Sequence, residues 1–259
     1  LVRIEFIQEG LFLVLEVKDL RKGFRSGLLG KKSEVLRGVS FQIPEGSVVG
    51  FIGANGAGKS TTIKTILGLI HADSGEVYFM GNKIKSCLFK EIGFLPERPS
   101  FYNFLTGKEL LTHFGLLSNK LSGSKLRNQV DALLKKVHLF DDKDRLIKTY
   151  SKGMIQRIGI AQALLHDPKL IILDEPLSGL DPDGRYQLSQ IIQEAADDGK
   201  TIFFSSHLLN DVEKLCKNLV VLREGELLYQ GETSKVLTNA QGATSLEDYF
   251  VKDVLRGDK

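Results

Sequence analysis

A glycine-rich segment directly after a short apolar run carries the residues best suited to chemistry in this chain. The run covers residues 48–52, and the segment reads Gly53-Ala54-Asn55-Gly56-Ala57-Gly58-Lys59-Ser60-Thr61. Its glycines allow a tight backbone curl in which N–H groups converge on phosphate oxygens. Lys59 can then reach the terminal phosphates, and the Ser60 hydroxyl can ligate the magnesium ion that bridges them. The segment therefore predicts a binding site for ATP or GTP together with Mg²⁺.

The residues after this loop predict a helix. Ile63, Ile66, Leu67 and Ile70 recur at helical spacing. The N-terminus of such a helix carries a partial positive charge, which would lie beneath the phosphates. A strand, a glycine-rich loop and a helix in this order fit a phosphate-binding motif better than an ordinary turn.

Two carboxylates follow a second apolar run. Residues 170–173 read Leu-Ile-Ile-Leu, and Asp174 and Glu175 come next. Ligands of an open parallel sheet bind at the carboxyl ends of its strands. Asp174 is thus placed to hold magnesium, through a water molecule, and Glu175 to polarise a water for attack on the γ-phosphate. An acidic turn after a buried strand is common by itself, and only the phosphate loop favours a catalytic interpretation here.

The early part of the chain predicts an antiparallel layer. Residues 14–17 read as a strand, and residues 39–43 alternate apolar and polar side chains up to a Pro-Glu-Gly turn. Gly81 and Asn82 separate two short extended runs within residues 75–84, which indicates a hairpin.

The middle and late parts of the chain predict helices followed by strand–helix alternation. Alternation of this kind is typical of a parallel sheet covered on both faces. Three amphipathic helices are expected near 110–117, 126–137 and 152–165. The alternating elements are strands at 170–173, 201–204 and 219–222 and helices at 186–196 and 208–215.

Four further segments resemble motifs of a single family. Residues 150–154 (Tyr-Ser-Lys-Gly-Met) are similar to a signature motif and open a helix upstream of Asp174, and residues 176–181 resemble the loop after its catalytic carboxylate. His207, after two serines, resembles its switch histidine, and Phe24 stands where the family places a ring that stacks on adenine. The motifs occur in the family's order, so the chain resembles the ATPase subunit of an ATP-binding-cassette (ABC) transporter.

The resemblance implies an α/β phosphate-loop NTPase (RecA-like) core with an antiparallel β subdomain and a helical subdomain. Residues 14–235 are then one ABC ATPase domain, with the helical subdomain at about 100–165, and residues 236–259 are a short C-terminal tail. The chain begins with Leu instead of Met, and we interpret residues 1–13 as a disordered or artefactual N-terminal segment.

The resemblance also implies a shared active site. In the family, two cassettes pair head to tail and hold ATP between the phosphate loop of one chain and the signature of the other, here Ser151 and Gly153. With one copy of each motif, a symmetric homodimer supplies two complete sites. His207 is expected to contact the γ-phosphate and orient the attacking water, and Asp181 to communicate across the interface.

Three residues depart from the family's commonest pattern. In the signature, Lys152 stands where the family's commonest form has glycine, and Met154 stands where it has glutamine. Glu97 stands where most relatives carry a glutamine that touches magnesium and senses the membrane partner. A carboxylate at position 97 is expected to join Asp174 and Glu175 around one metal ion. The departures resemble the exporter branch that moves drugs, polysaccharides or lipids through membrane subunits of six helices.

Composition limits the other functions that this chain could have. The net charge of +3 is small and scattered, so nucleic acid is not an expected partner. Two distant cysteines and five dispersed histidines predict no zinc site or disulfide. No apolar run approaches the roughly 20 residues of a membrane span. We therefore expect a cytoplasmic protein, peripheral at the inner face of the cell membrane through a polytopic membrane subunit.

Other functions stay open at this point. A soluble ABC ATPase of translation, repair or chromosome organisation is one alternative, but the chain lacks a second cassette, a coiled coil and zinc cysteines. A GTPase is another, although residues 119–122 (Asn-Lys-Leu-Ser) lack the Asp that would read guanine. A regulatory nucleotide-binding module without turnover is the third, and Glu175 and His207 argue against it.

Overall fold

The computed structural model describes residues 3–4, 12–25, 31–84, 90–118, 120–239 and 245–250. They belong to two compact units, one formed by Leu1–Ser86 with Thr201–Lys259 and the other by Cys87–Lys200. Cys87, Asn119, and parts of the predicted N-terminal segment and C-terminal tail lie outside the described residues. No helix in the described part of the chain combines the length and the apolar character that crossing a membrane requires.

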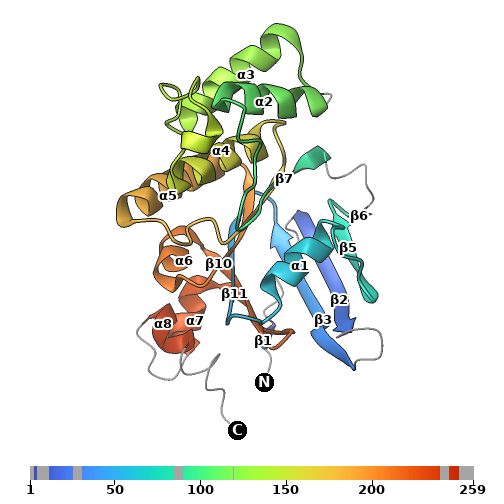
Figure 1. Ribbon diagram of the computed structural model, residues 1–259. Coiled ribbons are helices and arrows are strands. Elements are labelled where there is room, and N and C mark those ends of the chain that lie inside the picture. Colours follow the sequence, from blue (N-terminus) through green and yellow to red (C-terminus); the bar gives the residue numbers. More distant parts are fainter. Residues whose placement is uncertain are drawn as a thin grey trace. The chain divides into compact units, whose positions relative to one another are not determined.

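A mainly parallel group of strands carries the phosphate loop in the first unit (Figure 1). Its central strand β4 (Val48–Gly53) pairs in parallel with β9 (Thr201–Ser206) on one side and with β10 (Asn218–Arg223) on the other. β10 turns back as an antiparallel hairpin into β11 (Glu226–Glu232). β1 (Arg3–Ile4), inside the segment predicted to be disordered, pairs in parallel with β11.

The second sheet of this unit is antiparallel, as the sequence predicts. Its order is β3-β2-β5-β6, formed by β2 (Leu13–Arg25), β3 (Lys32–Pro44), β5 (Ser74–Phe79) and β6 (Asn82–Lys83). β2 and β3 are much longer than the predicted strands, because register shifts along their pairing interrupt the apolar–polar alternation that marks a strand in sequence. The ring of Phe41 of β3 packs on Phe51 and Phe203 of the parallel strands, with centroid distances of 5.8 and 5.5 Å, and the rings of Phe51 and Phe203 lie 5.0 Å apart.

Four helices accompany these strands: α1 (Lys59–Ile66), α6 (Leu209–Leu215), α7 (Thr233–Asn239) and α8 (Leu246–Tyr249). The helix predicted to reach Ile70 ends at Ile66 instead. Gly68 adopts a left-handed conformation (φ 66°), and its N–H donates to the carbonyl of Thr65, which closes the helix. Ile70 therefore continues the apolar spacing beyond the end of the helix.

The second unit joins a parallel strand pair to the helical region. β7 (Ile92–Leu95), a strand that the sequence analysis did not predict, pairs with β8 (Leu170–Asp174). The predicted helices correspond to α2 (Gly107–Leu117), α3 (Gly123–Lys136), α4 (Lys152–Leu164) and α5 (Pro182–Asp197). A capping box starts α2: Thr106 Oγ1 accepts from the Glu109 N–H at 3.2 Å, and the Glu109 carboxylate accepts from the Thr106 N–H at 2.8 Å.

Helix α4 packs directly on β7 because glycines stand at the contact. A Cβ on Gly93 of β7 would lie 2.2 Å from the carbonyl oxygen of Ala163, and one on Gly159 of α4 would lie 2.4 Å from Leu95 Cδ1. Any larger side chain would force the helix away from the strand. The helix that begins at the signature residues is thus held close to the strand that leads to Glu97.

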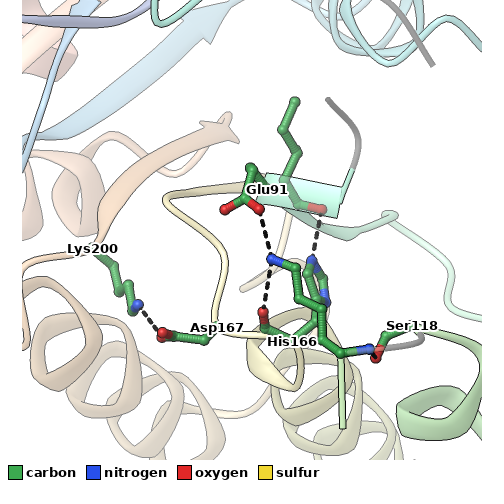
Figure 2. A network of polar contacts seen from close by, with 7 residues as sticks. Glu91, Ser118, His166, Asp167 and Lys200 are labelled. Carbon is green, nitrogen blue, oxygen red and sulfur yellow. Dashed lines mark hydrogen bonds and ion pairs between the residues drawn. The ribbon is translucent and has the colours of Figure 1, made fainter. Parts of the chain in front are cut away.

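A polar network holds the start of β7 to the end of α4 (Figure 2). Lys120 Nζ lies 2.7 Å from Glu91 Oε1 and 3.4 Å from the carbonyl oxygen of His166. His166 Nε2 donates to the carbonyl of Ile92 at 3.2 Å, and the neighbouring Asp167 pairs with Lys200. Burial lowers the pKa of His166 below its ordinary value of 6.5.

We expect His166 to make the stability of the fold sensitive to mild acid. Because the folded-state pKa is lowered, the unfolded chain binds the imidazole proton more tightly, and stability should fall as the pH drops below about 6.5. A His166→Gln variant, whose amide can still donate to Ile92, should lose less stability than the wild type between about pH 7.5 and 5.5. Urea unfolding at both pH values measures this, with exposed His113→Gln as the control. Equal losses in His166→Gln and the wild type would contradict it.

Candidate nucleotide-binding site

The phosphate loop runs from the end of β4 at Gly53 to the start of α1 at Lys59, and packing fixes its glycines. A Cβ on Gly53 would lie 2.5 Å from the carbonyl oxygen of Leu222. Gly58 is left-handed (φ 106°), and a Cβ there would lie 2.8 Å from Leu36 Cδ2. Gly56 is also left-handed (φ 82°), but open space surrounds it. The loop thus rests against neighbouring strands at Gly53 and Gly58 and is open at Gly56.

Positive charge gathers at the same loop. Lys59 is buried, and its Nζ donates to the carbonyl of Gly53 at 2.8 Å and to that of Ala54 at 3.4 Å. Within the described residues, α1 has neither a side-chain N-cap nor an acidic residue in its first turn. The helix N-terminus and the ammonium therefore act together on the space at the loop, which suits phosphate groups. Ser60, the second residue of α1, places its hydroxyl at this end of the helix.

His207 leaves the parallel strands beside the phosphate loop. Ile52 of β4 is paired with Ser206 of β9, so Gly53 and His207 directly follow paired residues. Ser206 Oγ accepts from the Leu208 N–H at 2.9 Å, which shapes the turn at the exposed His207. The predicted contact of His207 with a γ-phosphate stays a prediction.

Phe24 lies near the end of β2 and has 43% of its surface exposed. The ammonium of Lys22 lies 5.3 Å from the centroid of the Phe24 ring. An exposed aromatic ring on a strand can stack with a nucleobase, so the position is suited to the predicted role.

The two predicted catalytic carboxylates lie at the end of β8. Asp174 is its last residue and Glu175 follows, and both are buried. Glu175 adopts a left-handed backbone conformation (φ 50°), which is uncommon for a residue with a side chain. Its carbonyl accepts from the Ser178 N–H at 3.2 Å. Such strain persists where the surroundings impose it and is frequent at functional sites.

Glu97 lies at the same edge of the strand pair as Asp174, because Leu95 of β7 is paired with Leu173. Its carboxylate is half exposed and lies 3.7 Å from Nε of Arg98. Asp174 and Glu175, by contrast, are buried. The described residues contain no group of three or more acidic, His or Cys side chains that could hold a metal by themselves. The expectation that Glu97 joins Asp174 and Glu175 around one metal ion stays a prediction.

The sequence analysis missed one residue that supports Glu97. Gln156 of α4 is buried, and its Nε2 donates to the carbonyl of Glu97 at 3.3 Å. Its Oε1 has no hydrogen-bond partner among the described residues. Gln156 lies two residues after the signature motif, but nothing in its sequence neighbourhood indicates that a polar side chain there is buried.

The signature residues form the N-terminal turn of α4. Ser151 is the N-cap, and its Oγ accepts from the Met154 N–H at 3.2 Å. A Cβ on Gly153 would have nothing closer than 4.0 Å, so packing within the unit does not require glycine there. Lys152 Nζ lies against Gly179, where a Cβ would be only 2.2 Å away.

Asp181 has a local structural role that the sequence analysis did not foresee. It is the N-cap of α5, and its Oδ1 accepts from the Gly184 N–H at 3.1 Å, with Pro182 as the first helical residue. Its predicted role across a dimer interface stays a prediction.

The predicted site residues thus fall into two sets, one in each unit. The structure brings Lys59, Ser60 and His207 to one edge of the parallel strands in the first unit. It brings Glu97, Asp174 and Glu175 to one edge of β7 and β8 in the second. The other members are residues 53–58, Thr61 and Phe24 in the first unit and Ser151, Gly153 and Asp181 in the second.

A strand–loop–helix phosphate site on parallel strands, together with buried carboxylates after another parallel strand, defines a phosphate-loop NTPase. Residues 36–178 match the ABC transporter family. The chain is 41% identical over 233 residues to an uncharacterized ABC transporter ATP-binding protein of Synechocystis; the match covers 88% of this chain and 66% of that protein. The chain belongs to the ABC transporter family.

Two relatives carry more specific names. The bacitracin transport ATP-binding protein BcrA of Bacillus licheniformis is 41% identical over 73% of this chain and 62% of its own length. The lantibiotic transport ATP-binding protein SrtF of Streptococcus pyogenes is 35% identical over 93% of this chain and 98% of its own length.

Solved structures agree with this assignment. The structure of an ATP-binding subunit of an ABC transporter matches with a TM-score of 0.80 at 31% identity, covering 92% of this chain and 98% of that one. A dimeric post-hydrolysis state of the cassette MJ0796 bound to ADP and phosphate matches with a TM-score of 0.76 at 26% identity, over 84% of this chain and 98% of that one. The predicted α/β cassette fold is therefore confirmed, and the chain is an ATP-binding subunit of a family that hydrolyses ATP to power transport.

The two left-handed glycines of the loop predict different costs of substitution. Gly58→Ala places a methyl group against Leu36 and Val35 in a strained conformation. It should lower the free energy of unfolding by about 2–4 kcal/mol. Gly56→Ala meets no neighbour and should cost about 1 kcal/mol from backbone strain alone. Urea unfolding of both variants measures the difference, and equal losses would contradict the packing described for Gly58.

Proposed function

We propose that this chain is the ATP-hydrolysing subunit of an ABC exporter and that it drives substrate through a separate polytopic membrane subunit. The observation that carries ATP binding is the loop at Gly53–Lys59, where a buried ammonium and an uncapped helix N-terminus face the same space. Support for a role in transport comes from the relatives named for bacitracin and lantibiotic transport. The departures at Glu97, Lys152 and Met154 add support by resemblance.

In this proposal the phosphate-loop residues 53–61 hold the triphosphate and Phe24 stacks on adenine. Glu175 takes a proton from the attacking water, and His207 orients that water and contacts the γ-phosphate. Lys59 stabilises the negative charge that develops on the phosphates.

Ser60 and Asp174 are the proposed magnesium-holding groups. A hydroxyl at the start of α1 and a buried carboxylate at the end of β8 are both hard oxygen donors, the kind that Mg²⁺ prefers. The ion, when bound, would neutralise charge on the β- and γ-phosphates. We keep Glu97 as a further proposed ligand, because it lies at the same strand edge as Asp174.

We further propose that two copies of the chain share each ATP. Ser151 and Gly153 form a helix N-terminus whose surroundings are open at Gly153, which suits phosphate oxygens supplied by another molecule. One phosphate loop and one signature in each chain favour a symmetric homodimer. The similar cassette MJ0796 is dimeric in its post-hydrolysis state, which is consistent with this arrangement. Asp181, next to the signature in the same unit, would contact the partner chain.

A cluster of exposed apolar side chains in the second unit is the proposed docking surface for the membrane subunit. Tyr102 and Phe104 lie before α2 with 53% and 73% of their surfaces exposed, and their ring centroids are 5.7 Å apart. The His113 ring of α2 lies 6.2 Å from Tyr102, and Leu116 and Leu117 at the end of α2 are also exposed. Apolar patches of this kind mark interaction sites. A cytoplasmic position at the inner face of the membrane follows from this partner.

This cluster also favours transport over a soluble ABC ATPase or a regulatory module, because neither alternative needs a membrane partner. Residues 14–235 are the proposed ATPase domain, with the helical subdomain at about 100–165 and the tail at 236–259. The family assignment makes a GTPase switch protein the weaker interpretation.

Glu175→Gln should separate ATP binding from hydrolysis. The variant keeps the shape of the side chain but loses its basicity, so turnover should fall by about 10²–10⁴-fold. ATP affinity, measured with a fluorescent nucleotide, should change little. Glu194→Gln, on the exposed face of α5, is the matched control and should retain full turnover. Undiminished hydrolysis in Glu175→Gln would remove Glu175 from the role of general base.

A further inference from the structure

The carboxylate of Asp73 collects three donors at the end of β2 that carries Phe24. Its Oδ2 accepts from the Gly23 N–H at 2.7 Å and lies 2.8 Å from Lys32 Nζ, and its Oδ1 lies 3.4 Å from Lys22 Nζ. The Asp73 N–H in turn donates to the carbonyl of Arg21 at 2.8 Å. Asp73 thus connects the segment before β5 to both β2 and β3.

Two of these contacts are made by the residues just before Phe24 in the chain, Lys22 and Gly23. Gly23 immediately precedes Phe24, and the register of β2 against β3 shifts between Lys22 and Gly23. Such an irregularity leaves the strand end less firmly fixed by the ladder alone. The Lys22 ammonium, held by Asp73, lies 5.3 Å from the Phe24 ring centroid. A Cβ on Gly23 would lie 2.7 Å from Lys32 Cε, so the Lys32 side chain passes directly over Gly23.

We propose that Asp73 is a positioning residue for nucleotide binding: through the Gly23 N–H and the Lys22 ammonium it fixes the strand end and the ring of Phe24 for stacking on the nucleobase. This inference rests on the proposed function, in which Phe24 contacts adenine. Asp73 does not touch the nucleotide in this account. Its effect is confined to the base and leaves the phosphates to the Gly53–Lys59 loop.

The carboxylate of Asp73 is ionised at neutral pH. The hydrogen bonds from Lys32 and Gly23 lower its pKa to about 2. An Asn side chain therefore loses the attraction for both lysines but can still accept from Gly23, whereas Ala loses both kinds of contact. The two substitutions separate the ion pairs from the backbone hydrogen bond.

The test compares KM for ATP, kcat and inhibition by inorganic tripolyphosphate in the full chain. Asp73→Ala should raise KM for ATP about 3–10-fold and Asp73→Asn should raise it by less, and both variants should keep kcat within about twofold of the wild type. Phe24→Ala should raise KM about tenfold or more, because stacking of a base on an aromatic ring contributes substantially to affinity. Inhibition by tripolyphosphate, which lacks a base, should not change. Glu76→Gln breaks a similar exposed pair with Lys83 on the same sheet and is the matched control.

The double variant Phe24→Ala/Asp73→Ala decides whether Asp73 acts through the ring. A KM equal to that of Phe24→Ala supports the inference, because the two changes then remove one interaction. The inference would be overturned if the two changes raised KM additively in the double variant, or if Asp73→Ala lowered kcat. It would also be overturned if Asp73→Ala kept the wild-type KM while Phe24→Ala raised it. An unchanged KM in Phe24→Ala would instead refute stacking by Phe24 itself, and this inference with it, while leaving hydrolysis at Glu175 intact. Asp73→Asn carries the test if the Ala variant does not fold.

Discussion

The attraction between phosphate groups and the positive end of α1 is the interaction on which the rest of this structure depends. An uncapped helix N-terminus and a buried lysine converge on one loop, and the loop is held in place by strands that contact Gly53 and Gly58. The mutually packed phenylalanines Phe41, Phe51 and Phe203 join the two sheets of this unit. The apolar core of this unit thus holds the backbone N–H groups and the lysine of the loop in a fixed arrangement.

The second unit applies the same principle to carboxylates. Asp174 and Glu175 are buried where β8 ends, and the left-handed backbone at Glu175 turns the chain sharply after the strand. Two glycines allow α4 to lie directly on β7, and Gln156 binds the backbone of Glu97 from that helix. In the proposed mechanism, a displacement of the segment around Glu97 would therefore also move α4 and, with it, Ser151 at the start of that helix.

The sequence predicts the chemistry of this protein better than its geometry. The sequence predicts the roles of Lys59 and Asp174 and the strand–helix order, because glycine, lysine and acidic residues stand at fixed distances along the chain from apolar runs. Three features of the fold could not be predicted in this way. Register shifts conceal the full length of β2, and a left-handed Gly68 ends α1 before the apolar spacing ends. The strand β7 has only four residues, too few to show a clear period. The same limit applies to Asp73, Gln156 and the capping role of Asp181, since their partners are distant in sequence or unmarked by type. Glu97 is a different case: its expected part in a metal site rests on motif position alone and stays a prediction, since the described carboxylates form no group of three by themselves.

The central claim is that two chains complete each ATPase site, and mixing two inactive variants tests it most directly. One variant carries Lys59→Ala, and the other carries Ser151→Ala with Gly153→Asp. If the site is shared, each mixed dimer contains one site with an intact phosphate loop and an intact signature. An equal mixture should then recover up to about a quarter of wild-type turnover per chain, because half of the dimers are mixed and each has one of two sites intact. No recovery in a mixture shown to contain mixed dimers, or full turnover by the signature variant alone, would contradict the account.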